Sequence, residues 1–401
     1  MNVPKLRFKE FQDAWSPCVL NDFVSFAKGK GIAKADIDDD GVNFCIRYGE
    51  LYTTYGQVIK TVVSKTNIAE KDSILSKAGD VIIPASGETQ IDIATAACVT
   101  QNGIILGGDL NILSHSESGE WLAYYLSSTK KFEIAQLAQG NSVVHLYSSQ
   151  LKDLSINKPS HAEQTKIASF LSAVDDKIAA LRQEHDLWQQ YKQGMIQQLF
   201  SQTLRFQDDN GQDFPDWEEI SLKNFLILKS RPINTPKESY HALGVRSHFK
   251  GLFNKFDSDP NKISMETLYQ VHKDDFVVNI TFAWEGALAI AKDEHHEGLV
   301  SHRFPTYRCD ETKVSLQYFK YCFIQPRFLS AVQLCSPGGA GRNRVLSKKD
   351  FMEINIPFPC LQEQTKIADC LSSIDDKIDA LAQQLEQARL WKQGLLQQMF
   401  V

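Results

Sequence analysis

One long segment of this chain occurs twice: residues 161–200 recur, without a gap, as residues 361–400. Both copies contain Glu-Gln-Thr-Lys-Ile-Ala near the start, Asp-Asp-Lys-Ile in the middle, and Lys-Gln-Gly with a later Gln-Gln near the end. A repeat of this size indicates duplication, which limits the possible folds more than any other feature of the sequence. We therefore expect a globular unit and a helix, followed by a second globular unit and a second helix.

The globular units share only short segments with each other. Leu-Arg-Phe occurs at 6–8 and at 204–206, a tryptophan follows at 15 and at 217, and a proline precedes each long repeat at 159 and 359. An aspartate precedes an apolar run at 80–83 and again at 275–278, and elsewhere the units differ almost completely. Nearly identical helices beside divergent units predict a fixed frame that carries two different recognition domains.

Apolar residues recur along both copies at alternating steps of four and three, which is the period of about 3.5 of a coiled coil. We expect each copy to form a helix of roughly 55–60 Å, and the two helices to pack on each other antiparallel. The alternative is that each helix packs back onto its own globular unit. His185 falls at a seam position and is interpreted as a structural residue, not as a ligand. The expected seam residues are Ile167, Leu171, Val174, Ile178 and Leu181 in the first helix, and Ile367, Leu371, Ile374, Ile378, Leu381 and Leu385 in the second.

The globular units mix short apolar runs with turn signals, which predicts an α/β (α+β) fold. Strands are expected at 81–84, 103–106 and 277–280, and aromatic-containing helices at 120–137 and 315–334. A chain of 401 residues suits two domains of about 150–160 residues and two helices. The predicted parts are domain 1 at 1–159, the first helix at 160–200, domain 2 at 201–359 and the second helix at 360–401.

Net charge is unevenly distributed along the chain. The whole chain carries −6, yet residues 221–360 carry 19 lysines and arginines against 14 acidic residues, a net charge of +5. A local basic surface, and not the global charge, is what binds phosphate. The body of the second unit is therefore a candidate nucleic-acid surface.

Cysteine, histidine and hydropathy patterns bear on compartment and metals. The eight cysteines form no Cys-x-x-Cys, which argues against a zinc site or disulfide framework and favours a reducing cytoplasm. His295-His296 allows either a loop metal site or a solvated loop. We find no signal peptide and no apolar run long enough for a membrane span, so we expect a cytoplasmic protein without membrane contact.

Candidate DNA-binding residues lie in the loops of both units. Basic residues, glycines and interleaved tyrosines suit backbone contact and base stacking, although each tyrosine equally suits a half-buried strand position. A glycine-rich loop at 336–344 ends in Arg-Asn-Arg. Its backbone N–H groups could form an anion-binding nest, arginine suits guanine and asparagine suits adenine. The alternative is a mobile surface loop whose charges are solvated. The candidates are Lys28, Lys30, Lys34, Arg47, Tyr48, Tyr52, Tyr55, Ser86, Thr89, Gln90 and Asn141 in the first unit, and Arg246, His248, Lys250, Arg303, Arg342, Asn343, Arg344 and Lys348 in the second.

Motifs of catalysis are missing from the sequence. It contains no amino-methylation motif, no Walker motif, no dinucleotide fingerprint, no nucleophile elbow and no convincing Cys/His/Asp constellation. The residues that do repeat lie in the helices, where catalysis is not expected. We therefore expect no catalytic residue, no metal site and no cofactor on this chain.

The chain resembles the specificity (S) subunits of type I restriction–modification systems over its whole length. The resemblance rests on the twin Glu-Gln-x-x-Ile-Ala motifs at 163–168 and 363–368, each preceded by Ile-x-x-Pro, and on the Asp-Asp-Lys-Ile and Lys-Gln-Gly-x-x-Gln-Gln-x-Phe segments. Residues 30–37 and 46–52 also resemble one recurrent type of target-recognition domain.

This resemblance implies two target-recognition domains that each read half of a split double-stranded DNA site, with the helices as a spacer of pseudo-two-fold symmetry. It also implies two methyltransferase subunits, which bind S-adenosylmethionine, and optionally two restriction subunits, which bind ATP and Mg. Two other classes stay open: a structural adaptor that does not touch DNA, and an enzyme with an unrecognised site. A salt-dependent gel shift would distinguish a specificity subunit from a structural adaptor. Incubation of the isolated chain with methyl donor or nucleotide would reveal an enzyme.

Overall fold

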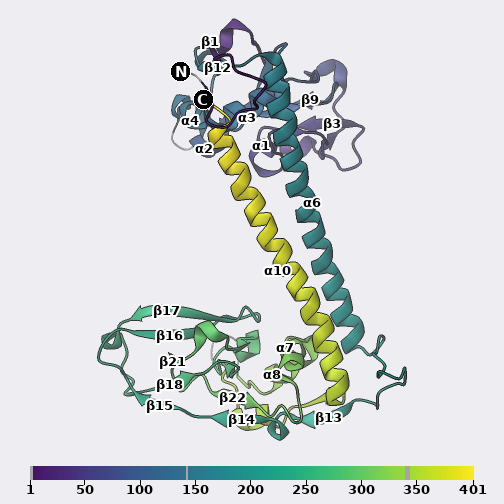
Figure 1. Ribbon diagram of the computed structural model, residues 1–401, viewed down its shortest axis with the longest axis vertical. Helices are drawn as coiled ribbons and strands as arrows, with labels where there is room; N and C mark the ends of the chain where they lie inside the picture. Colours follow the sequence, from purple (N-terminus) through teal and green to yellow (C-terminus); the bar gives the residue numbers. More distant parts are fainter. Residues whose placement is uncertain (1–2, 141–142, 339–343) are drawn as a thin grey trace. The chain divides into compact units, whose positions relative to one another are not determined.

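The computed structural model describes residues 3–140, 143–338 and 344–401, so the predicted site residues Asn141, Arg342 and Asn343 lie outside the described residues. The chain forms two compact units, and the first of them draws on two distant parts of the sequence (Figure 1). Unit 1 combines Met1–Glu184 with Leu381–Val401, and unit 2 is His185–Ala380. Each unit therefore contains one globular domain, the beginning of the helix that follows it, and the end of the other long helix.

The repeated segments form the two long helices that the sequence predicts, α6 (His161–Phe200) and α10 (Leu361–Gln398). In unit 1, Leu171 of α6 and Leu395 of α10 lie in one core cluster. In unit 2, Leu371 of α10 and Leu199 of α6 do the same. Within each unit the start of one helix thus packs on the end of the other, which confirms the antiparallel pairing.

The predicted seam residues are buried apart from Ile178 and Ile378, which are half-buried, but the seam does not contact only the other helix. Val174 belongs to the core cluster of unit 1, and Ile374 belongs to that of unit 2, each together with residues of its own globular domain. The helix pairing is thus confirmed, but treating packing on the domain as an alternative to it was wrong, because the first turns of each helix do both. A helix wedged between a domain and a second helix needs apolar residues at the same steps as a coiled coil does.

The domain of unit 1 is built on a five-stranded sheet in the order β2-β10-β6-β8-β4. The central strand β6 occupies the predicted strand at 81–84 and is entirely buried. Its five strands are β2 (Ser25–Lys28), β10 (Leu110–Ser114), β6 (Val81–Pro84), β8 (Ala97–Val99) and β4 (Val58–Ile59). The smaller sheets are β5-β3-β9 (Lys65–Thr66, Asn43–Ile46, Ile105–Leu106), β11-β7 (Val144–His145, Ser86–Gly87) and β1-β12 (Ser16–Val19, Ser155–Lys158).

The domain of unit 2 keeps part of this plan and adds to it. A four-stranded sheet contains β14 (Leu226–Lys229), β22 (Thr306–Cys309), β19 (Phe276–Val278) and β20 (Leu288–Ile290), in that order. A second, five-stranded sheet contains β15 (Pro232–Asn234), β18 (Thr267–Val271), β21 (Gly298–Val300), β16 (Tyr240–Val245) and β17 (Leu252–Ser258). The pair β13-β23 (Glu218–Ser221, Asn355–Phe358) matches β1-β12 of unit 1.

Short helices complete both domains, and two of the predicted helices are divided. The segment 120–137 forms α3 (Gly119–Ser128) and α4 (Lys131–Leu137). The segment 315–334 forms α7 (Leu316–Cys322) and α8 (Pro326–Leu334), because Pro326 cannot continue a helix but suits the first turn of one. The remaining helices are α1 (Glu50–Thr53), α2 (Gln90–Ile93), α5 (Ser148–Lys152) and α9 (Lys348–Met352).

Candidate nucleic-acid interface

The repeated Glu-Gln pair holds each long helix to its own domain. In unit 1 the buried carboxylate of Glu163 accepts two hydrogen bonds from Arg7, at 2.7 and 2.8 Å, and a third from the Trp15 indole at 3.3 Å. Gln164 accepts a hydrogen bond from the amide of Ser118 at 3.1 Å and donates one to the carbonyl of Pro159 at 3.0 Å.

Unit 2 repeats these contacts. Glu363 accepts hydrogen bonds from Arg205 at 3.1 and 2.8 Å and from Trp217 at 3.2 Å. Gln364 accepts from the Ser315 amide at 2.8 Å and donates to the Pro359 carbonyl at 2.9 Å. The repeats are visible in the sequence, but their contacts are not. The shared spacing of arginine, tryptophan and Glu-Gln was the available signal.

A second repeated contact ties together three elements of each unit. The Tyr124 hydroxyl of α3 donates to Asp175 of α6 at 2.6 Å, and Lys392 of α10 pairs with the same carboxylate at 2.6 Å. In unit 2 the Tyr321 hydroxyl donates to Asp375 at 2.6 Å, and Lys192 pairs with Asp375 at 2.5 Å. Burial and the hydrogen bond to the carboxylate raise the pKa of both tyrosines. The same frame therefore holds two unlike domains.

Two loops of the unit 1 domain lie side by side. The first follows β6 and contains Ser86, Thr89 and Gln90; the second follows α4. Strand β7 in the first loop pairs with β11 in the second, and the Gln90 side chain reaches the Ala138 carbonyl at 3.5 Å. Ser86 is buried in β7, whereas Thr89 and Gln90 are exposed. Two exposed polar side chains therefore stand where two loops meet.

Unit 2 places the corresponding loops together as well. After β19, a turn at 281–286 and the residue before it meet the end of α8 and the segment that follows it. The Gln333 side-chain amide donates to the Trp284 carbonyl at 3.1 Å, and the Leu346 backbone amide donates to the Ile280 carbonyl at 2.8 Å. The Arg344 guanidinium lies over the Trp284 ring at 5.2 Å. Arg303 donates to the hydroxyl of Thr281 at 3.3 Å.

The β16–β17 turn, which carries three predicted residues, packs against the same turn at 281–286. The His248 amide donates to the Glu285 carbonyl at 2.8 Å, while the Arg246 guanidinium lies 4.8 Å over the Phe253 ring and Lys250 is exposed. Arg303, Arg344 and His248 therefore gather around one turn. The turn itself, with Thr281 and Trp284, was not predicted. The available signal was its position, because it follows β19 as the loop of Ser86–Gln90 follows β6.

Lysines of unit 1 are exposed, while two other candidates are engaged within the domain. Lys28 lies 5.7 Å from the Tyr147 ring, and Lys30 and Lys34 are exposed. By contrast, Arg47 pairs with the buried Glu50 at 3.3 Å, and the Tyr55 hydroxyl accepts from the Val63 amide at 3.0 Å.

Tyr48 and Tyr52 are half-buried. Burial raises the pKa of Tyr52, and the nearby Tyr48, Glu88 and Asp92 raise it further.

Basic side chains also line a small pocket of unit 2. Its volume is about 140 Å³, and Lys229, His302 and Lys348 line it together with apolar and hydroxyl residues. None of its lining residues is acidic. Lys348 was predicted from the sequence, and Lys229 and His302 lie with it around this pocket.

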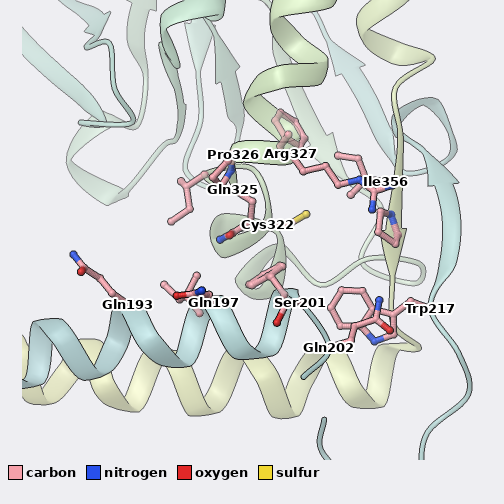
Figure 2. Close-up of a pocket in the computed structure, with 15 residues that line it drawn as sticks. Gln193, Gln197, Ser201, Gln202, Trp217, Cys322, Gln325, Pro326, Arg327 and Ile356 are labelled. Carbon is pink, nitrogen blue, oxygen red and sulfur yellow. The ribbon is translucent and has the colours of Figure 1, made fainter. Parts of the chain in front are cut away.

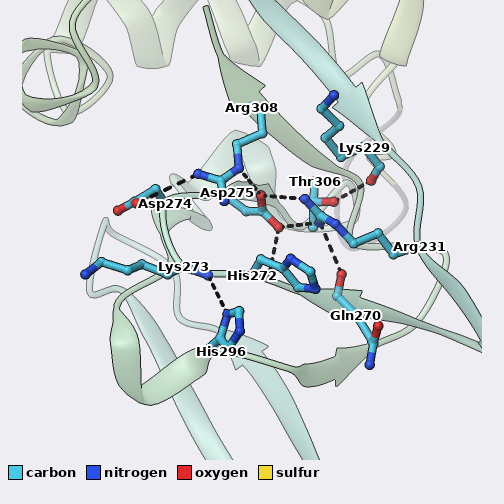
Figure 3. A network of polar contacts seen from close by, with 10 residues as sticks. All are labelled: Lys229, Arg231, Gln270, His272, Lys273, Asp274, Asp275, His296, Thr306 and Arg308. Atoms are coloured by element: carbon cyan, nitrogen blue, oxygen red, sulfur yellow. Dashed lines mark hydrogen bonds and ion pairs between the residues drawn. The ribbon is translucent and has the colours of Figure 1, made fainter. Parts of the chain in front are cut away.

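A buried carboxylate supports the sheet edge beside this pocket (Figure 3). Asp275 is fully buried and accepts from Arg231 at 2.6 and 3.2 Å, from Arg308 at 3.0 Å and from the His272 amide at 2.8 Å. The two guanidiniums come from the β14–β15 connection and from β22, so one side chain holds three segments together.

The histidine pair lies between β20 and β21. Among the described residues, no group of three or more His, Cys, Asp or Glu side chains could hold a metal ion. His295 is buried and its Nδ1 accepts a hydrogen bond from the Lys292 amide at 3.0 Å, so the expectation of a solvated loop was wrong for this residue. Burial lowers the pKa of His295, which favours the neutral ring.

Comparison with known proteins defines the family. A model of the type I restriction modification DNA specificity domain matches residues 12–187 and 217–389. The type I restriction enzyme MjaVIII specificity subunit of Methanocaldococcus jannaschii is 24% identical over 430 residues, which cover 98% of this chain and 94% of that protein. A protein of the same organism named as the MjaX specificity subunit is 27% identical over 276 residues, covering 66% of this chain and 62% of that protein.

A solved structure shares the fold over the whole chain. The crystal structure of the type I restriction–modification S subunit from M. genitalium matches with a TM-score of 0.62 at 17% identity, covering 100% of this chain and 99% of that one. The chain belongs to the family of type I restriction–modification specificity subunits. It is by that membership a recognition subunit and not an enzyme. No helix among the described residues is long and apolar enough to cross a membrane.

Proposed function

We propose that the chain directs a type I restriction–modification enzyme to DNA, with each globular domain reading one half of an asymmetric bipartite site. The observation that carries this proposal is the pair of loops described above. Both domains bring the loop after the central strand together with the loop before the final short helix, and the sequences of these loops differ between the domains. Equivalent placement with different side chains is what two readers of different half-sites require.

The side chains at these loops divide into two chemical groups. The pocket of Lys229, His302 and Lys348 and the exposed Lys28, Lys30 and Lys34 suit phosphates, which position the protein on the duplex without reading it. Arg303, Arg344, Thr89 and Gln90 carry groups that pair with base edges in the major groove. Arg47 and Tyr55 are the weakest candidates, because both already have partners within the domain.

The long helices set the distance between the two recognition domains and dock two methyltransferase subunits. Large apolar side chains are exposed along the paired helices, namely Leu187 and Tyr191 in unit 2 and Leu390 and Trp391 in unit 1. Such side chains suit coverage by a partner. The methyltransferase subunits bind S-adenosylmethionine, and the restriction subunits, where present, bind ATP and Mg. The assembly acts on DNA in the cytoplasm.

Replacing Arg344 or Arg303 with alanine should weaken the binding of cognate duplex by the methyltransferase-bound complex. A base-reading arginine contributes about 1–3 kcal/mol and its loss relaxes specificity at one position, whereas a phosphate contact weakens all sequences alike and lowers the salt slope by about 1. The measurement is binding of cognate and half-site-mutated duplexes at two salt concentrations. Lys237→Ala, at an exposed lysine of the same unit, is the matched control.

Unchanged affinity of both arginine variants for every duplex, at both salts, would place the turn at 281–286 away from DNA. A wild-type complex that shows no salt-dependent preference for any duplex would instead favour the structural adaptor. Methyl transfer by the isolated chain would favour an enzyme.

Exchanging residues 1–158 for the matching domain of a relative should change one half-site and leave the other intact. The reason is that the loops of each domain are held by contacts within its own unit. Base-resolution methylation mapping of cells that carry the chimaera measures the outcome. A change in both halves would contradict independent reading.

A further inference from the structure

Unit 2 contains an apolar cavity at the end of its part of α6. It has a volume of about 580 Å³ and lies between the end of α6, the α7–α8 turn and strand β23 (Figure 2). Phe200, Ser201, Trp217, Cys322 and Pro357 are among the residues that line it. All lining residues belong to unit 2.

The internal repeat identifies what fills the corresponding place in unit 1. The side chains of Ser118 and Ser315 cap α3 and α7 in the same way. The tyrosines six residues later, Tyr124 and Tyr321, donate to the equivalent carboxylates of the long helices. The next residue is Tyr125 in unit 1 and Cys322 in unit 2. A phenol side chain in one unit is thus a thiol in the other.

The surroundings of the Tyr125 ring match the walls of the cavity. Its ring centre lies 6.5 Å from that of Trp15 and 5.7 Å from that of Phe400. Its hydroxyl donates to the Val401 carbonyl at 2.7 Å and accepts from the Asn157 amide at 3.1 Å. The residues at the same places in the repeat of unit 2 are Trp217, Phe200, Ser201 and Pro357, and all four line the cavity.

The missing ring leaves apolar surface uncovered. Trp15 is 2% exposed and Phe400 is 5% exposed, whereas Trp217 and Phe200 are only half-buried. Apolar cavities lined by aliphatic and aromatic side chains take up ring-sized apolar molecules. Glutamine side chains and the Ser201 hydroxyl supply a few polar groups at the wall, which is the usual composition of a small-molecule site.

We propose that this cavity is a binding site for a small phenolic molecule, whose ring takes the place that Tyr125 occupies in unit 1. Proline at 357 has no N–H, so the hydrogen bond that the Tyr125 hydroxyl accepts from Asn157 has no equivalent in unit 2. The hydroxyl of a bound phenol can therefore donate a hydrogen bond, as the Tyr125 hydroxyl does, but it accepts none from Pro357 of β23. The volume exceeds one ring, so substituted phenols fit. This site does not depend on DNA recognition.

The test uses the full chain and p-cresol, which is the side chain of tyrosine as a free molecule. Calorimetric titration should show one equivalent bound to the wild type and none to Cys322→Tyr, whose own ring takes the place proposed for the bound ring. Tyr125→Cys should open the equivalent place in unit 1 and raise the stoichiometry to two. Cys322→Ser, which keeps the cavity, is the control and should bind one equivalent. 4-Methylanisole, which cannot donate, should bind more weakly than p-cresol.

Circular dichroism establishes that each variant is folded. If Cys322→Tyr does not fold, the stoichiometry of Tyr125→Cys and the preference for p-cresol over 4-methylanisole still decide the matter. The absence of saturable p-cresol binding by the wild type overturns the proposal, as does binding that persists unchanged in folded Cys322→Tyr.

Discussion

Replacing Leu371 with aspartate should unfold unit 2 at temperatures where the wild type is folded. Leu371 is fully buried in the core cluster that joins α10, the domain of unit 2 and the end of α6. Truncating a buried leucine costs about 2–5 kcal/mol, and a carboxylate without a partner at the same place adds a desolvation penalty. The expected loss is comparable to the whole stability of a domain, about 5–15 kcal/mol.

Hydrogen exchange resolved by peptide measures this loss separately in the two units. Ser373→Asp is the matched control, since it adds the same charge at an exposed position of α10 and should leave exchange in unit 2 nearly unchanged. Protection of β19 and α7 in Leu371→Asp at the level of the control would show that this seam residue does not support the domain.

The substitution Asp275→Asn should destabilise unit 2 by about 3–5 kcal/mol, which is the usual cost of removing one charge of a buried ion pair. Arg231 and Arg308 would then face a neutral amide, and two of the three segments that Asp275 joins would lose their charged partner. Urea unfolding followed by tryptophan fluorescence, with hydrogen exchange to localise the effect, measures the change.

Asp80 is the matched position in unit 1 and serves as the control for Asp275. It is also buried, but it accepts from the Ser114 hydroxyl at 2.7 Å and the Lys77 amide at 2.8 Å, and none of the described arginines pairs with it. Asp80→Asn should therefore cost only about 1–3 kcal/mol. Equal losses in the two variants would mean that the guanidiniums contribute nothing to unit 2.

The long helices could be predicted in detail because their periodicity and their repetition point to the same structure. Buried Ile167, Leu171 and Val174 and their counterparts all lie where the seam predicts. That the first turns of each helix also pack on a domain could not be predicted, because an apolar stripe does not specify what covers it. Pro326 was visible in the sequence, yet the segment around it was still assigned to a single helix.

The candidate interface was predictable only as far as local composition reaches. Arg303, Arg344 and His248 were selected for their charge, and the structure shows that they gather around one turn. That turn is held by backbone hydrogen bonds such as that from Leu346 to Ile280, which join residues more than 60 apart and leave no mark in a short motif. The second sheet of unit 2 was missed for the same reason, since long-range strand pairing is not visible in local patterns.

The chain order within unit 1 bears on how the protein is made on the ribosome. Met399 and Phe400, which follow all of unit 2 in the sequence, lie in the core of unit 1, and the Leu6 amide donates to the Gln398 carbonyl at 2.9 Å. Domains usually fold in the order in which they are synthesised. Here the first domain to leave the ribosome cannot complete its core until the whole of unit 2 has been synthesised. Unit 2 is one continuous segment and is complete earlier, so the nascent chain finishes its second half first.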